Sequence, residues 1–167
     1  DLDCLMLSEE TAIGRYPVQA VEYMREIALE AEELYFEQKT EIIGPGQKSA
    51  ENFLAYGACQ LAEKISAKAL VAHTNSGATA RLISACRPSQ PIFGLTQFTR
   101  VLKYMNFSWG VNPIKIGDEP KDHLKRTQNF VEQSKDFKPG DKLVIMAGHP
   151  KPGQDSSPTN LLKIYCK

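Results

Sequence analysis

Long hydrophobic runs are absent from this chain of 167 residues. No apolar segment approaches the roughly 20 residues that a helix needs to cross a bilayer, and no signal peptide or transit segment is visible at the N-terminus. An excess of charge is absent too, because 20 Lys and Arg balance 20 Asp and Glu. These absences argue against a dedicated nucleic-acid or anionic-membrane surface. We expect a cytoplasmic protein with neither kind of partner.

Paired cysteines are also missing. The four cysteines are scattered within apolar patterns, form no Cys-x-x-Cys pair, and show no metal-ligand spacing to the three histidines. We therefore expect buried free thiols in a reducing compartment, and no structural metal. The cysteines are Cys4, Cys59, Cys86 and Cys166.

Glycine is scarce in the stretch around which the chain is organised. Residues 69–72 have the length and branching of a buried strand, residues 74–79 are small or hydroxylic, and a helical pattern begins at Ala78. Gly77 stands alone in this turn, which excludes the three-glycine dinucleotide turn, and no Gly-Lys-Ser/Thr follows as in a P-loop. A strand, a short turn and a helix nevertheless direct backbone N–H groups and a positive helix end toward an anion.

Two interpretations of this turn stay open. Thr74, Ser76 and Thr79 offer hydroxyl donors, and Gly77 lets a phosphate approach the backbone closely, which favours an anion site. Alternatively, Ser76 is only the N-cap of the helix that follows.

Helical and strand patterns alternate along the chain. The apolar periodicities predict helices over residues 17–36, 50–65, 78–86, 98–104 and 118–135. They predict strands over residues 1–7, 69–72, 91–96, 110–116, 142–147 and 160–166, the last at an edge. This order indicates a three-layer α/β/α fold, a mostly parallel five-stranded sheet with helices on both faces, preceded by one strand–helix unit.

The carboxyl ends of parallel strands are where such sheets bind ligands. Thr74, Thr96 and Gly148 stand at predicted strand ends. The segment over residues 149–158 is too long for a tight connection and has room to close over whatever the turn holds.

The N-terminal residues carry a long and specific resemblance. Residues 3–17 read DCLMLSEETAIGRYP and are similar to the pyruvate kinase segment D-C-x-M-L-S-x-E-T-A-x-G-x-Y-P. Later motifs of that family follow in the same order, at residues 74–80, Arg87-Pro88, Pro91-Ile92, residues 138–141 and Thr159-Asn160. The resemblance covers essentially the whole chain, but only the C-terminal third or so of a full pyruvate kinase.

The resemblance implies two parts. Residues 1–36 correspond to the last strand and helix of a truncated (β/α)₈ catalytic barrel, and residues 45–167 to the C-terminal α/β regulatory domain. Such a parent enzyme transfers phosphate from phosphoenolpyruvate to ADP in glycolysis, uses Mg²⁺ and K⁺, and forms a homotetramer. Since a strand–helix unit alone cannot close a barrel, we expect the fragment to be inactive and to hold no cofactor, but to self-associate.

The barrel part contains two residues that the resemblance places near the active site. Ser8 matches a serine at the mouth of that site, and Glu10 and Thr11 lie beside it in the motif. One interpretation gives Ser8 and Glu10 catalytic contacts. The other is that Glu10 and Thr11 only cap or order the loop.

The regulatory part of the family binds a phosphorylated sugar or a nucleotide monophosphate at the strand–turn–helix. The residues implied to hold the phosphate or cover the sugar are Thr74, Asn75, Ser76, Gly77, Thr79, Lys151, Gly153 and Ser156. Asn75 stands where sugar-bisphosphate-activated members often have lysine, and Ala78 where many have Arg or Lys. Each missing cation removes a charge-assisted contact worth about 1.5–3 kcal/mol. We therefore expect a monophosphate effector, with an empty site as the alternative.

Three side chains on the last predicted helix have two interpretations. His123, Lys125 and Arg126 supply either a second cationic anchor for the effector or merely a solvated helix face. His73 is expected to be a strand-end histidine with satisfied hydrogen bonds.

A second function is compatible with the same residues. The chain could be a stand-alone phospho-ligand sensor or assembly module that shares the regulatory fold. The barrel signature at residues 3–17 favours the pyruvate kinase interpretation, because a stand-alone sensor has no use for the last strand of a barrel.

Overall fold

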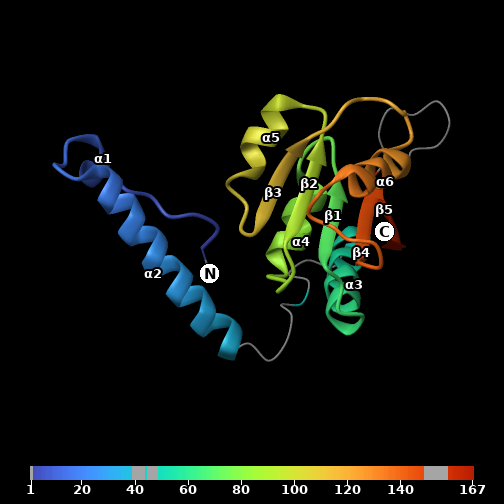
Figure 1. Ribbon diagram of the computed structural model, residues 1–167, viewed down its shortest axis with the longest axis horizontal. Coiled ribbons are helices and arrows are strands. Elements are labelled where there is room, and N and C mark those ends of the chain that lie inside the picture. The colour runs from blue at the N-terminus through green and yellow to red at the C-terminus, as the bar shows by residue number, and fades with distance from the viewer. Residues whose placement is uncertain (1, 39–43, 45–48, 149–157) are drawn as a thin grey trace. The chain divides into compact units, whose positions relative to one another are not determined.

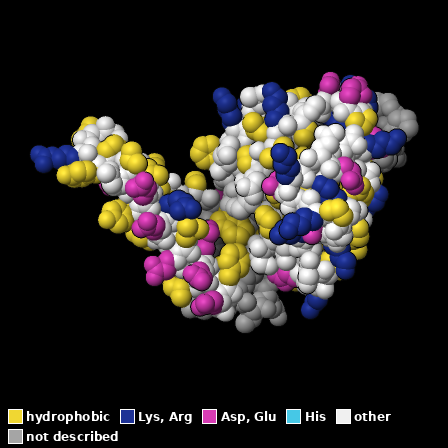
Figure 2. Space-filling view, viewed as in Figure 1, with side chains coloured by type: hydrophobic (Ala, Val, Ile, Leu, Met, Phe, Trp, Pro, Cys, Tyr) yellow, Lys and Arg dark blue, Asp and Glu magenta, His cyan; other side chains and the backbone are white. Residues whose placement is uncertain are grey.

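The chain forms two compact units in a computed structural model, which describes residues 2–38, 44, 49–148 and 158–167 (Figure 1). One unit comprises residues 1–41 and the other residues 42–167. In the described parts of both units, no helix is long and apolar enough to span a membrane. Basic and acidic side chains both occur across the visible face of the larger unit (Figure 2).

The smaller unit is built from two helices. α1 (Glu9–Ala12) is a single turn, and α2 (Pro17–Gln38) begins with the proline whose missing N–H suits the first helical position. The long helix is therefore confirmed. Hydrophobic side chains such as Val21, Tyr23 and Ile27 remain exposed along it.

The strand expected over residues 1–7 is wrong. Residues 2–7 belong to no helix or strand. A strand is held by backbone hydrogen bonds to a neighbouring strand, and the described part of the smaller unit contains helices alone. The alternation of apolar residues over residues 1–7 is a local pattern, and it does not provide a second strand to pair with.

The larger unit contains a five-stranded sheet in the order β3-β2-β1-β4-β5. The strands are β1 (Ala69–His73), β2 (Ile92–Thr96), β3 (Val111–Lys115), β4 (Lys142–Gly148) and β5 (Thr159–Cys166). The first four run parallel, and β5 pairs antiparallel with β4 at one edge. β3 lies at the other edge, where Pro113 is tolerated because an edge strand does not need every N–H. The predicted fold class is confirmed.

Helices cover both faces of this sheet (Figure 1). These helices are α3 (Ala50–Lys64), α4 (Ala78–Ala85), α5 (Thr99–Met105) and α6 (His123–Gln133). Leu70 and Ala72 of β1 pack in one buried cluster with residues of α3, α4 and α5, whereas Val71 packs in a second cluster with Val131 of α6. The two-residue period of β1 thus divides its side chains between two cores.

Two expectations about the larger unit need correction. α6 begins at His123 rather than near residue 118, because the Asp122 side chain accepts the N–H groups of Leu124 and Lys125 and fixes the helix start there. Cys166 is exposed, as is Cys4 in the smaller unit, so burial holds only for Cys59 and Cys86. Cys166 is exposed because it ends an edge strand.

Two glycines give a matched test of packing. An added Cβ at Gly94 would lie 2.9 Å from Met105 Sδ and 3.1 Å from Val111 Cγ1, whereas one at Gly57 in α3 would meet nothing within 4 Å. Gly94→Ala is therefore expected to destabilise the larger unit by about 1–3 kcal/mol through overpacking. Gly57→Ala should stabilise it by about 0.5–1 kcal/mol through helix propensity. Urea denaturation measures both changes in the free energy of unfolding. Equal changes for the two substitutions would contradict the close packing described around Gly94.

Candidate anion-binding site

A cavity of about 430 Å³ lies at the carboxyl ends of β1 and β4, against the first turn of α4. It is the position at which parallel sheets of this kind bind ligands. The lining residues are Glu51, His73, Thr74, Asn75, Ser76, Ala78, Thr79, Leu82, His123, Gly148, Pro158 and Thr159. Four of the five turn residues expected to hold a phosphate are therefore brought together, and Gly77 completes the turn between them.

The turn organises itself through its own hydroxyl groups. Gly77 has a φ of 82°, a left-handed conformation that suits glycine, and it occupies the N-cap position of α4. Thr74 Oγ1 accepts the Gly77 N–H at 2.9 Å, and Ser76 Oγ accepts the Ala78 N–H at 3.4 Å. The N-cap is therefore Gly77 and not Ser76, because the left-handed conformation at this position of the turn favours glycine.

Thr79 connects the turn to the far end of the sequence. Its Oγ1 lies 2.7 Å from Thr159 Oγ1 in a hydrogen bond between residues 80 positions apart. Thr159 is the first residue of β5. This contact places the start of β5 beside the turn, and it uses one hydroxyl that the sequence assigned to an anion.

Two histidines form a wall of the cavity. The rings of His73 and His123 stack with centroids 4.1 Å apart and an interplanar angle of 21°. His123 Nδ1 lies 3.0 Å from the carbonyl oxygen of Gly148. The sequence offered His123 as an anchor for the effector but did not indicate its pairing with His73, because the two residues are distant in the chain and only the fold places them together.

His73 does not have the satisfied hydrogen bonds that we expected. It is 2% exposed, and neither ring nitrogen has a partner among the described residues. Burial lowers its pKa to about 3, with further lowering by His123 and Arg126. His73 is therefore neutral at pH 7, with one N–H donor and one acceptor on a ring that lines the cavity.

Asn75 also has a polar side-chain atom without a hydrogen-bond partner among the described residues. Its Oδ1 is buried without a partner in the part of the chain that the structure describes. Lys151, Gly153 and Ser156, expected to cover the ligand, lie outside the described residues.

The two candidate catalytic residues occupy the smaller unit. Glu10 Oε2 accepts the Ser8 N–H at 2.9 Å, and Thr11 Oγ1 donates to the Ser8 carbonyl oxygen at 3.2 Å. Hydrogen bonds from the backbone of Glu10 and then of Ser8 lower the pKa of the Glu10 carboxyl. These are the contacts of the loop-ordering alternative, in which Glu10 caps α1.

The three candidate cations on α6 separate into different environments. His123 and Arg126 are 7% and 6% exposed, so the expectation of a solvated helix face is wrong for both, and Lys125 alone is exposed. His123 lines the cavity by the turn, whereas Arg126 lines a second cavity beside β3. The cap at Asp122 fixes where α6 begins, and positions 123 and 126 of the helix are consequently buried while position 125 is exposed.

The larger unit is an α/β domain with a cavity at the carboxyl ends of its parallel strands, the position at which such folds bind small molecules. A family model described as pyruvate kinase, alpha/beta domain, matches residues 52–165. The chain belongs to this pyruvate kinase alpha/beta domain family.

Whole-chain relatives agree with the family. The chain is 34% identical over 171 residues to a pyruvate kinase of Clostridium acetobutylicum, with 97% of this chain and 35% of the relative covered. It is 36% identical over 166 residues to a pyruvate kinase of Agrobacterium vitis, covering 97% and 34%. A chloroplastic pyruvate kinase isozyme A of Nicotiana tabacum is 30% identical over 154 residues, covering 87% and 26%. The chain thus spans about a third of the length of the first two relatives.

Proposed function

We propose that this chain is the C-terminal regulatory portion of a pyruvate kinase and that its turn over residues 74–79 binds a phosphorylated effector. The observation that carries the proposal is the cavity of about 430 Å³ at the start of α4, lined by the turn and by buried, unpartnered polar atoms of His73 and Asn75. Buried polar groups normally have partners. A polar ligand would provide them.

The first turn of α4 supplies the attraction for a phosphate. N–H groups at the start of a helix have no intrahelical acceptor, and the helix dipole adds partial positive charge there. Thr74 and Ser76 already occupy the N–H groups of Gly77 and Ala78. The N–H group of Thr79, the hydroxyl groups of Ser76 and Thr79, and the His73 ring therefore remain as hydrogen-bonding groups for a phosphate.

The charge of the cavity favours a monophosphate over a bisphosphate. No lysine or arginine lines it among the described residues, and Glu51 contributes one carboxylate. A second phosphate group would meet no cation there to balance its charge. We therefore propose a sugar monophosphate or a nucleotide monophosphate as the effector.

The activity of the parent enzyme is a separate part of the proposal. The whole protein would transfer phosphate from phosphoenolpyruvate to ADP as a cytoplasmic homotetramer, with Mg²⁺ and K⁺ bound outside this chain. Residues 1–36 would complete its barrel. In the described part of the chain, no group of three His, Cys, Asp or Glu side chains could hold a metal ion. We expect this chain alone to transfer no phosphate.

A stand-alone sensor is the second candidate, favoured by the observation that residues 42–167 form a compact unit of their own. Sequencing the gene upstream of Asp1 separates the two. An upstream reading frame of repeated strand–helix units supports the barrel enzyme, whereas a start codon directly before Asp1 supports the sensor.

Thermal unfolding with added phosphate esters tests the effector site. Glucose 6-phosphate and AMP are the monophosphate probes, and fructose 1,6-bisphosphate is the comparison. A probe at a hundred times its Kd should stabilise the larger unit by about 2.7 kcal/mol. Ser76→Ala and Thr79→Ala should each weaken binding about fivefold, because each removes a hydrogen-bonding group worth about 1 kcal/mol.

Ser134→Ala is the matched control, since Ser134 lies outside this cavity. Its response to each probe should equal that of the unsubstituted chain. The proposed site is contradicted if no phosphate ester shifts the transition, or if Ser76→Ala and Thr79→Ala leave the shift unchanged.

A further inference from the structure

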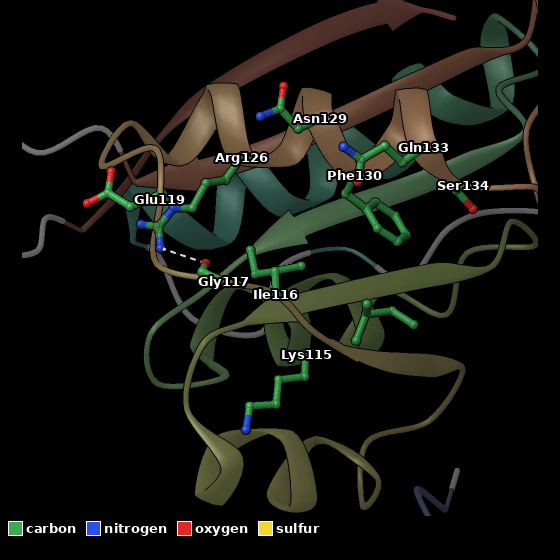
Figure 3. Close-up of a pocket in the computed structure, with 10 residues that line it drawn as sticks. Lys115, Ile116, Gly117, Glu119, Arg126, Asn129, Phe130, Gln133 and Ser134 are labelled. Carbon is green, nitrogen blue, oxygen red and sulfur yellow. Dashed lines mark hydrogen bonds between the residues drawn. The ribbon is translucent and has the colours of Figure 1, made fainter.

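A second cavity, of about 470 Å³, lies between β3, the segment that follows it, and α6 (Figure 3). It shares no lining residue with the cavity at the turn. The two cavities are therefore separate places in the larger unit.

Arg126 is the charged group of this cavity. It is 6% exposed, and its Nη1 donates to Gln97 Oε1 at 2.9 Å and to the Gly117 carbonyl oxygen at 3.4 Å. Its Nε is buried with no partner among the described residues. Figure 3 shows the side chain reaching from α6 to the Gly117 segment across one end of the cavity. A guanidinium stays charged in proteins, so two neutral oxygens face a buried cation.

No carboxylate of the described residues neutralises Arg126 at ion-pair distance. Asp118, Glu119 and Asp122 act on it only from farther away: burial lowers its pKa, and these three carboxylates raise it. The Glu119 side chain also lines the cavity, but its carboxylate pairs with exposed Lys121 at 3.6 Å. A buried charge without a paired counter-charge is costly.

One part of the cavity wall is apolar, and the remainder carries polar side chains such as Asn129 and Gln133. Ile114, Ile116 and Phe130 line the apolar part, and the Phe130 ring contacts Phe93 with centroids 6.0 Å apart. Lys115 is not a second anchor, because it points away from Arg126 in Figure 3 and its Nζ donates to Thr99 Oγ1 at 3.0 Å. A buried cation next to this apolar patch of Ile114, Ile116 and Phe130 would suit an anion that also has an apolar part.

We propose that this cavity binds a small organic monoanion, with its carboxylate on the Arg126 guanidinium and its apolar body against Phe130 and Ile116. The planar fork of arginine matches a carboxylate in a bidentate contact. The ligand would supply the counter-charge that the described residues do not. The apolar body distinguishes this ligand from a free inorganic anion.

Chemical-shift mapping on the ¹⁵N-labelled chain tests the proposal with three probes. Benzoate carries the carboxylate and the apolar body, benzyl alcohol only the apolar body, and inorganic phosphate only the charge. Benzoate is expected to shift the amides of residues 115–117 and 129–134 in a saturable manner. Each of the other two probes should bind there at least about tenfold more weakly, because each lacks one half of the contact.

Arg126→Gln and Lys125→Gln form a matched pair on one helix. Both remove one positive charge, but Lys125 is exposed and does not line the cavity. Arg126→Gln should weaken benzoate binding about tenfold or more, whereas Lys125→Gln should change it less than about twofold because exposed charges are screened. Equal effects of the two substitutions would overturn the proposal.

Asn129→Asp keeps the test decisive if Arg126→Gln does not fold. Asn129 is exposed and lines the cavity three residues beyond Arg126, so an aspartate there would compete for the guanidinium. We expect benzoate binding to fall several-fold. Unchanged binding in Asn129→Asp, or no saturable shift with benzoate in the unsubstituted chain, would refute the site. Amide shift changes on adding inorganic phosphate that are confined to residues 74–80 would indicate binding at the proposed effector site and not in this cavity.

Discussion

Replacing Ile145 with alanine is expected to lower the free energy of unfolding of the larger unit by about 3–4 kcal/mol. Ile145 is fully buried on β4 and packs in the core between the sheet and α6. β4 is paired on both sides, with β1 and β5, so the backbone cannot easily collapse into the vacated space. Urea denaturation followed by tryptophan fluorescence measures the loss, because the single tryptophan, Trp109, belongs to this unit.

Ile164→Ala is the matched control for Ile145→Ala. Ile164 lies on the neighbouring strand β5 but is 46% exposed. Its truncation should cost about 1 kcal/mol or less, because less apolar surface leaves the core. A loss at Ile145 no larger than that at Ile164 would contradict the described packing of β4.

Acidification from pH 7 to pH 5 is expected to lower the free energy of unfolding by about 2 kcal/mol through His73 alone. Burial holds the folded pKa of His73 at about 3, below the ordinary value of 6.5. The unfolded chain therefore binds more protons between these two values. The stabilising contribution is complete above pH 6.5 and is lost as the pH falls toward 3. Thermal unfolding at a series of pH values measures the decline.

His73→Phe isolates the contribution of this one ring. Phenylalanine keeps a planar ring against His123 but has no group that titrates, so the pH dependence should flatten by most of those 2 kcal/mol, about 1.5 kcal/mol or more. The imidazole resonances of His73 in the unsubstituted chain should also fail to titrate between pH 7 and pH 5. An equally steep acid decline in His73→Phe, or an ordinary titration of His73, would contradict the neutral buried state.

Local sequence patterns predicted most of the larger unit. The apolar runs of β1 and β4 and the amphipathic stretches of α3 and α4 have lengths and periods that specify strand or helix without reference to partners. The same reasoning was wrong at residues 1–7, where a strand-like alternation has no neighbouring strand among the described residues of its unit. It was also wrong about where α6 begins, because a cap contact rather than periodicity fixes that point.

The candidate site was predicted only in part. The hydroxyl-rich turn at residues 74–79 was recognisable because strand, turn and helix are adjacent in sequence. The stacked pair His73–His123 and the contact of Thr79 with Thr159 were not, because each joins segments that are distant in the chain. The burial of Arg126 could not be predicted either, because the charge pattern of a helix does not reveal which of its cations will lie against the sheet.

The sequence by itself determined the element order of the larger unit, the parallel α/β class, the glycine-containing turn and the membership of the pyruvate kinase alpha/beta domain family. These follow from local periodicity and motifs. The tertiary structure decided which polar groups share a cavity, which histidine has a lowered pKa and which cation is buried. Those properties depend on desolvation and on contacts between distant segments, and both exist only once the sheet has brought β1, β4 and α6 together.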